Sequence, residues 1–146
     1  MEHNIGKASK NEYPEIIRIW EKSVRATHHF LKEEDIEYYK PLILDKYLDI
    51  VELSVLRTEN DEIVGFLGTT GKNIEMLFIH PDYFGIGLGR LLVEFAIEKL
   101  GTNTVDVNEQ NERAVGFYKH CGFTVTERSE LDATGKPYPI LHMKLK

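Results

Sequence analysis

Apolar residues in the first third of the chain recur at helical spacing. Between Pro14 and Val24 they return every three or four positions, which predicts an amphipathic helix with the proline in its first turn. A second helical stretch is predicted over residues 33–48, with Pro41 as a kink or break. A short strand around Ile5 precedes both stretches. The amino-terminal part is therefore expected to be mainly helical.

After residue 50 the period changes to that of strands. Residues 51–57 and 63–69 read as two strands of a hairpin, and residues 74–79 are apolar at nearly every position, as in a strand covered on both faces. Farther along, helices are expected at 88–100 and 112–120, and strands at 104–107, 123–131 and 138–145. The pattern predicts an α/β or α+β fold around one mixed sheet of about seven strands.

Composition narrows the class of protein. The chain has 146 residues, of which 42% are hydrophobic and 29% charged, typical of one folded domain over residues 1–146. The net charge is −6 and no basic run occurs, so nucleic-acid binding is not expected. Cys121 has no partner for a disulfide, and no apolar stretch approaches the roughly 20 residues of a membrane helix. Residues 1–10 lack the apolar run of a signal peptide, so we expect a cytoplasmic protein without membrane contact.

A loop rich in glycine joins the strand at 74–79 to the helix at 88–100. Gly85, Gly87 and Gly89 alternate there, and glycine lets the backbone come close to a ligand. The first amides of the following helix have no internal acceptor, and the helix dipole adds positive charge, which suits a pyrophosphate. The loop therefore predicts a phosphate site, with a tight structural loop as the alternative.

Two common phosphate motifs fit this loop less well. A P-loop ends in Gly-Lys-Ser/Thr, whereas Gly89 is followed by Arg90 and Leu91. The dinucleotide fingerprint G-x-G-x-x-G directly follows its strand, whereas this loop is G-x-G-x-G and begins several residues later. Asp106 lies at about the distance expected for a ribose-binding acid, which keeps a dinucleotide-dependent oxidoreductase as an alternative.

A second motif follows within residues 108–123. Its pattern N-x-x-A-x-x-F-Y-x-x-x-G-F is carried by Asn111, Ala114, Phe117, Tyr118, Gly122 and Phe123. With the two motifs at the right separation, the chain resembles the GNAT superfamily of N-acetyltransferases, whose Q/R-x-x-G-x-G/A loop holds the pyrophosphate of coenzyme A. Gly87 and Gly89 match that loop, but Phe84 stands where the family usually has Arg or Gln. The departure concerns one side-chain contact to the cofactor and leaves the backbone amides in place.

The resemblance implies a twisted, mostly antiparallel sheet flanked by about four helices, with acetyl-coenzyme A in a cleft between diverging parallel strands. Transfer would be direct, in a ternary complex, to a small-molecule amine, a protein lysine or a protein amino terminus, without a metal. Both a monomer and a homodimer are compatible with it. The implied cofactor-binding residues are Leu77, Phe78, Ile79, Phe84, Gly85, Gly87, Leu88, Gly89, Arg90, Asn111 and Tyr118.

Two side chains are candidates for proton transfer. A phenol with a pKa of about 10 can protonate a departing thiolate, and the resemblance implies this role for Tyr118; a core aromatic is the alternative. Glu75 interrupts an apolar strand where related enzymes often carry a base; a solvent-facing strand start is the alternative. Asn111 is expected to contact the cofactor or to cap its helix, and Arg90 to reach a phosphate or to stay in solvent.

The resemblance places the acceptor site between the first two helices and the late loops. The positions there are Arg25, Thr27, His28, His29, Phe30 and Tyr138. Of these, His28 and Phe30 are the predicted acceptor-binding residues, with a solvated helix end as the alternative for at least one histidine. The two histidines lack the further spaced ligands of a metal site. A module that binds acyl-coenzyme A without catalysis is the second functional alternative.

Overall fold

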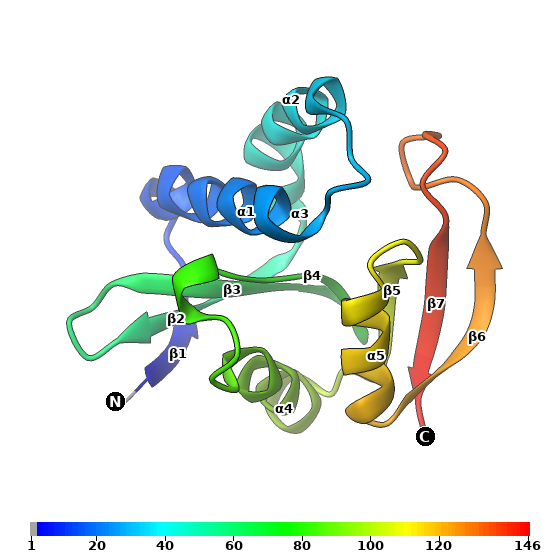
Figure 1. Ribbon diagram of the computed structural model, residues 1–146. Coiled ribbons are helices and arrows are strands. Elements are labelled where there is room, and N and C mark those ends of the chain that lie inside the picture. The colour runs from blue at the N-terminus through cyan, green and yellow to red at the C-terminus, as the bar shows by residue number, and fades with distance from the viewer. Residues whose placement is uncertain (1–2) are drawn as a thin grey trace.

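The computed structural model describes residues 3–146, which build one seven-stranded sheet with helices on both of its faces (Figure 1). The strands lie in the order β1-β2-β3-β4-β5-β7-β6, and every neighbouring pair is antiparallel except β4 and β5. The predicted mixed, mostly antiparallel fold class is confirmed. In chain order the strands are β1 (His3–Lys7), β2 (Glu52–Thr58), β3 (Ile63–Thr70), β4 (Asn73–Ile79), β5 (Thr104–Asn108), β6 (Phe123–Ser129) and β7 (Ile140–Leu145).

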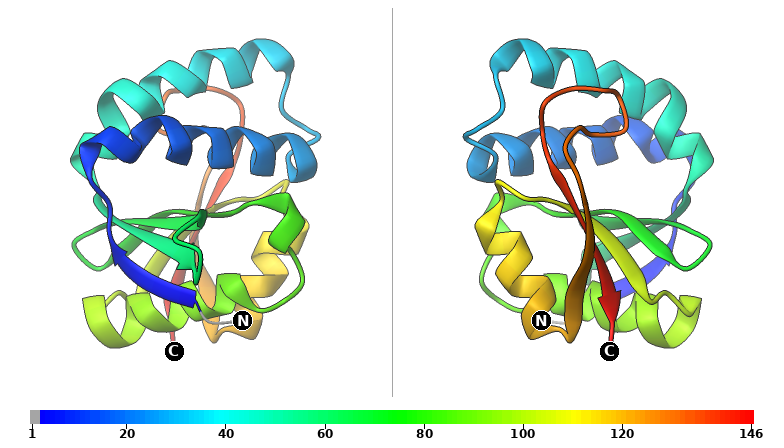
Figure 2. Two further views of the ribbon diagram at one scale, coloured as in Figure 1. Left: turned by 90° about the vertical axis from the view of Figure 1, so that its left-hand side faces the viewer. Right: turned by 90° about the vertical axis from the view of Figure 1, so that its right-hand side faces the viewer.

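The helices form one layer on each face of the sheet (Figure 2). In chain order the helical segments are η1 (Lys10–Glu12), α1 (Tyr13–Thr27), α2 (Glu33–Leu42), the π-helical turn η2 (Ile43–Tyr47), α3 (Leu48–Ile50), the 3-10 turn η3 (Pro81–Tyr83), α4 (Leu88–Leu100) and α5 (Glu112–His120). α1 and α2 lie over one face, and α4 and α5 over the other. Among residues 3–146, no helix is long and apolar enough to cross a membrane.

Each layer has its own apolar core. The buried stripe of α1, which includes Ile16 and Trp20, packs with Phe66 of β3 on one face. On the other face, Leu92 of α4 packs in a cluster with Val105 of β5. Truncating a buried aliphatic side chain of this kind to alanine typically costs about 2–5 kcal/mol. The two cores hold the sheet firmly from both sides and so fix the loops at its edges.

β4 and β5 run together for only two residue pairs, Asn73 with Thr104 and Ile74 with Val105. Beyond these pairs the two strands diverge (Figure 1). Within the described residues, the edge of β4 that faces β5 then has no strand partner. Because unpaired backbone amides and carbonyls need partners, this edge is suited to binding a ligand.

The second helical stretch departs from its predicted form. The α-helix continues through Pro41 to Leu42, and the wider turn η2 follows before α3 ends at Ile50. Proline has no N–H and its ring crowds the preceding turn, so hydrogen bonds are lost around it. Here the helix continues through the proline and widens just after it, where a kink or break at the proline was predicted.

Two strand predictions are also corrected. The last strand begins at Ile140, two residues later than predicted, because Tyr138 is tied through its hydroxyl to Asp35 of α2 instead. The strand at 74–79 is not covered on both faces, since Glu75 is exposed where β5 has diverged. Both differences depend on contacts with segments far away in the sequence.

Candidate active site

A cavity of about 490 Å³ opens where β4 and β5 diverge. Its walls come from β4, the glycine loop, the first turn of α4, β5, α5 and the carboxyl end of α1. All of the residues predicted to bind the cofactor line it, namely Leu77, Phe78, Ile79, Phe84, Gly85, Gly87, Leu88, Gly89, Arg90, Asn111 and Tyr118. The fold therefore brings the two sequence motifs to one place.

Glycine is favoured at the three positions of this loop for two different structural reasons. Gly85 and Gly87 have φ angles of 78° and 88°, in the left-handed region that glycine adopts without strain. Gly89 lies against α5, where an added Cβ would come 3.4 Å from Cζ of Phe117. The first helical hydrogen bond of α4 runs from Leu91 N to the Gly87 carbonyl, so the preceding amides are left without an acceptor in the helix. These amides can donate to phosphate oxygens.

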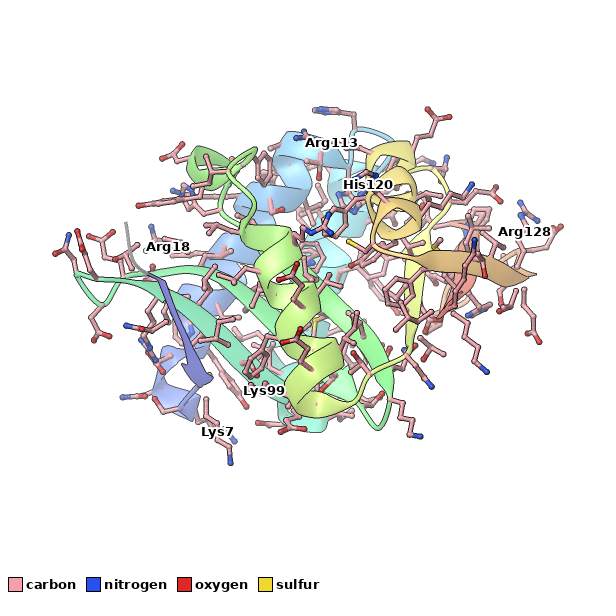
Figure 3. All side chains as sticks on the ribbon, turned by 90° about the horizontal axis from the view of Figure 1, so that it is seen from below. Lys7, Arg18, Lys99, Arg113, His120 and Arg128 are labelled. Atoms are coloured by element: carbon pink, nitrogen blue, oxygen red, sulfur yellow. The ribbon has the colours of Figure 1, made fainter. Side chains whose placement is uncertain are left out.

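Two arginines lie beside this loop. Arg90 pairs with Glu94 one turn later, with 3.1 Å between Nε and Oε1. Arg113 lies in the first turn of α5 (Figure 3). Its guanidinium carbon is 5.7 Å from the centre of the Phe84 ring. Arg113 lines the cavity but was missed in the sequence, because only the packing of α5 on the loop reveals it.

Tyr118 of α5 is both a core aromatic and a residue of the cavity wall. Its ring packs edge-on against Phe117 and Phe123, with centroids 5.1 and 5.9 Å away. Burial raises the pKa of the Tyr118 phenol far above its usual value, so the group stays protonated. Among residues 3–146, no side-chain hydrogen bond occupies the Tyr118 hydroxyl, although the residue is only 6% exposed. The phenol is therefore a neutral donor that a ligand in the cavity can use.

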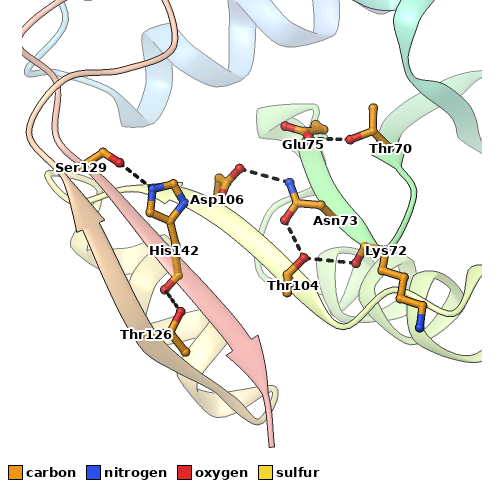
Figure 4. Close-up of polar contacts among 9 residues, drawn as sticks. All are labelled: Thr70, Lys72, Asn73, Glu75, Thr104, Asp106, Thr126, Ser129 and His142. Carbon is orange, nitrogen blue, oxygen red and sulfur yellow. Dashed lines mark hydrogen bonds and ion pairs between the residues drawn. The ribbon is translucent and has the colours of Figure 1, made fainter.

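Glu75 of β4 lines the cavity just beyond the last residue pair that joins β4 to β5. The residue is exposed and its Oε1 accepts a hydrogen bond of 2.5 Å from the Thr70 hydroxyl of β3 (Figure 4). The exposure of Glu75 agrees with the alternative interpretation of the sequence, in which this residue faces solvent at the start of its strand. Because Glu75 also lines the cavity, its role as a base stays a prediction.

His28 ends α1 and lines the cavity beside Phe78 of β4, with ring centroids 6.3 Å apart. Burial, with a smaller effect of the neighbouring His29, lowers the pKa of the His28 imidazole to about 4. The Thr27 hydroxyl donates its only proton to the Ser23 carbonyl at 2.9 Å. Because of its low pKa, His28 is neutral at pH 7. His28 Nδ1 lies 2.7 Å from Thr27 Oγ1, and in the tautomer in which Nδ1 donates to this oxygen, Nε2 is an acceptor.

The other residues predicted for the acceptor site are arranged around His28. Phe30 packs against His28 and Tyr138, with ring centroids 5.2 and 6.1 Å apart, but is not among the cavity-lining residues. Arg25 is engaged in ion pairs with Glu21 and Glu33. His29 is exposed, as the helix-end alternative described. Phe30 can therefore affect the cavity by positioning His28. The two ion pairs hold the Arg25 guanidinium away from the cavity.

Two polar residues of the cavity have structural partners. Asn111 caps α5, since its Oδ1 accepts a hydrogen bond of 3.2 Å from the Ala114 amide, while its contact with a cofactor stays a prediction. Asp106 of β5 receives Asn73 Nδ2 at 3.1 Å and has His142 Nδ1 2.6 Å from its other oxygen (Figure 4). These two partners explain why a carboxylate is present at position 106, and no contact with a ribose is needed to explain it.

Comparison with known proteins decides the family. Residues 25–146 match the family model described as an acetyltransferase (GNAT) domain. The chain belongs to the GNAT acetyltransferases. It is an enzyme that transfers an acetyl group to an amine, and the oxidoreductase alternative has no support.

Individual relatives of this GNAT protein agree with the assignment. The peptidyl-lysine N-acetyltransferase YjaB of Salmonella typhimurium is 46% identical over 140 residues, which are 96% of each chain. The solution structure of apo YjaB from Escherichia coli superimposes with a TM-score of 0.91 at 44% identity, covering 99% of this chain and 97% of that one. The PaiA N-acetyltransferase from Thermoplasma acidophilum, crystallised with coenzyme A, shares the fold at a TM-score of 0.74, 21% identity and 99% coverage of both chains.

Proposed function

We propose that this protein transfers the acetyl group of acetyl-coenzyme A to the side-chain amine of lysine in a protein acceptor, in the cytoplasm. The observation that carries the proposal is the extent of the likeness to the peptidyl-lysine N-acetyltransferase YjaB, which spans 96% of both chains. The region of likeness therefore includes α1, α2 and the loop between β6 and β7, which lie around His28. It also includes the residues that line the cavity next to the glycine loop.

The open edge of β4 supports the proposed position of the donor substrate. The backbone groups along Leu77, Phe78 and Ile79 border the cavity and have no strand partner on the β5 side within the described residues. They can bind the pantetheine arm and hold the thioester carbonyl near donors. Fixed donors at a developing oxyanion are worth about 3–4 kcal/mol. The amides at the start of α4 would then meet the pyrophosphate.

The acceptor lysine has to lose a proton before it can attack, because the pKa of a free lysine is about 10.4. Glu75 is the proposed base, directly or through a water, at the solvent-exposed end of the cavity. The bare Nε2 of His28 would accept a hydrogen bond from the same amine and orient it. Neutral His28 avoids the charge repulsion that an imidazolium would exert on an ammonium group.

The balance of the reaction is simple. The amine nitrogen forms a bond to the acetyl carbon, the carbon–sulfur bond breaks, and the proton released by the amine ends on the sulfur of coenzyme A. Tyr118 is the proposed donor to the departing thiolate. Since burial raises the pKa of its phenol, its contribution is a hydrogen bond to the developing charge, with the proton quickly recovered.

The proposal is tested with spermidine and three matched peptides: one with a blocked amino terminus and one lysine, one with arginine instead of that lysine, and one with a free amino terminus and no lysine. Acetylation is followed by mass spectrometry, and the Tyr118→Phe variant controls for uncatalysed transfer. Acetylation of the lysine peptide alone is expected. Acetylation of only the free amino terminus, or of spermidine in place of every peptide, would overturn the choice of acceptor.

A further inference from the structure

The glycine loop of this chain lacks a side chain that can bind a phosphate at its first position. Phe84 is half-buried there and its ring has no hydrogen-bond donor. Arg90, at the other end of the loop, has its guanidinium beside the Glu94 carboxylate at 3.1 Å. The loop therefore offers backbone amides to a pyrophosphate but supplies no uncompensated positive charge of its own.

Arg113 supplies such a charge from a different element. Its guanidinium carbon lies 5.7 Å from the centre of the Phe84 ring, and the residue lines the same cavity as the loop. Within residues 3–146, Arg113 forms no ion pair with a carboxylate. A guanidinium over an aromatic ring is held by cation–π attraction while its N–H groups stay free to donate.

The position of Arg113 in its helix favours a role in binding. It is the second residue of α5, after Glu112, where the helix dipole disfavours a positive charge by a few tenths of a kcal/mol. A phosphate group near this end of α5 would reverse the effect, because it would pair with the guanidinium. The helix dipole therefore gives no stabilisation to Arg113 in the absence of an anion.

We infer that Arg113 provides the side-chain contact to the pyrophosphate of acetyl-coenzyme A, and that Phe84 serves as the platform that orients it. In this chain the side-chain positive charge beside the loop comes from α5, and the Phe84 ring of the loop supports it. This inference rests on the proposed use of acetyl-coenzyme A as the donor. It adds a binding residue at a position that the second sequence motif leaves variable, between Asn111 and Ala114.

The test compares wild type with Arg113→Gln for three donors: acetyl-coenzyme A, acetyl-3′-dephospho-coenzyme A and S-acetylpantetheine. Calorimetry gives Kd for the two nucleotides, and kcat/KM is measured for all three. Charge-assisted hydrogen bonds contribute enough that we expect about a tenfold or larger loss for both nucleotides. No loss is expected for S-acetylpantetheine, which has no pyrophosphate. An equal loss for all three donors would show a purely structural role, and a loss for acetyl-coenzyme A alone would assign Arg113 to the 3′-phosphate.

A reciprocal exchange tests the link between the two positions. Phe84→Arg in the Arg113→Gln background should recover most of the lost affinity, because it returns the charge to the loop. Phe84→Leu should weaken nucleotide binding while Arg113 is still present, since the platform is lost. A double variant that binds no better than Arg113→Gln alone would overturn the inference. Arg113→Lys keeps the charge but not the planar fork of the guanidinium. Its Kd for the nucleotide donors should therefore lie between those of wild type and Arg113→Gln.

Controls separate this inference from the proposed function. Arg18→Gln removes a positive charge of α1 that is also exposed, where Arg18 pairs with Glu15 at 3.3 Å, and should leave Kd unchanged. If wild type binds none of the nucleotide donors, the proposed function fails. If wild type binds acetyl-coenzyme A and Arg113→Gln binds it equally well, only the inference about Arg113 fails. Thermal melts of each variant confirm that binding is compared between folded proteins.

Discussion

The Tyr138 hydroxyl donates a hydrogen bond to the carboxylate of Asp35 and so ties the loop between β6 and β7 to α2. Lys136 Nζ lies 3.0 Å from the other oxygen of Asp35. The hydrogen bond from Tyr138, followed by that from Lys136, holds the pKa of the Asp35 carboxyl below its usual value. Because the Tyr138 ring packs near Phe30, which in turn packs on His28, this contact supports the wall of the proposed acceptor site.

Tyr138→Phe should therefore raise the acceptor KM several-fold and leave the Kd for acetyl-coenzyme A unchanged. The free energy of unfolding should fall by about 1.5–3 kcal/mol, as for a lost hydrogen bond to a charged group. Steady-state kinetics and urea unfolding measure the two effects. Tyr13→Phe is the matched control, since the Tyr13 hydroxyl bonds Leu48 O at 3.1 Å away from the cavity and should affect stability alone. An unaltered acceptor KM in Tyr138→Phe would contradict the prediction.

Tyr118→Phe should lower kcat by about 10²-fold or more, because general-acid groups contribute about 10²–10⁴-fold. Stability should change little, since no side-chain hydrogen bond in the described chain is lost with the hydroxyl. The Kd for coenzyme A should also be preserved. Single-turnover rates and a thermal melt check the three expectations together. Near-normal turnover at saturating substrate would leave Tyr118 as a core aromatic only.

Glu75→Gln should lower kcat/KM for a lysine peptide most strongly at neutral pH. As the pH rises towards the pKa of lysine, about 10.4, the amine loses its proton without help and the difference from wild type should narrow. The pH–rate profiles of both enzymes measure this. Thr70→Val is the control, since it removes only the 2.5 Å hydrogen bond to Glu75 and keeps the carboxylate. A ratio of rates that stays constant with pH would exclude Glu75 as the base.

His28 should make the fold less stable in mild acid. Its pKa is lowered from 6.5 to about 4 in the folded protein, so the unfolded chain takes up a proton first as the pH falls. The stabilisation is complete above about pH 6.5 and is lost between there and pH 4. Between pH 7.5 and 4.5, wild type should lose about 2 kcal/mol more of its free energy of unfolding than His28→Gln does. Equal losses in urea titrations would show that His28 titrates normally.

Local signals in the sequence were sufficient to predict much of the secondary structure and many of the residues that line the cavity. The helix at 88–100 has the bounds of α4, because its start after Gly87 and its end at Gly101 are both marked by glycine in the left-handed region. The residues predicted to bind the cofactor line one cavity for a similar reason, since the residues after β4 and those of α5 form two short, continuous motifs. Each of these features depends on neighbours within a few positions.

The features that were missed depend on distant contacts. Nothing near Tyr138 in the sequence indicates that its hydroxyl binds Asp35, 103 positions earlier. Arg113 looks like an ordinary exposed helix residue until α5 is packed beside Phe84. The low pKa of His28 likewise follows from the burial that the end of α1 acquires over β4.

The parallel pairing of β4 with β5 has a mechanical consequence. With only two residue pairs joining β4 and β5, the sheet is in effect two half-sheets connected by a short seam. The helices α1 and α4 pack on β3 and β4, and α5 packs on β5 and β6. A molecule that spans the gap contacts α4 and β4 on one side and α5 on the other. It would thereby link the two halves of the sheet. Substrate binding would thus complete the architecture of the sheet, and release of coenzyme A would return the seam to its open form.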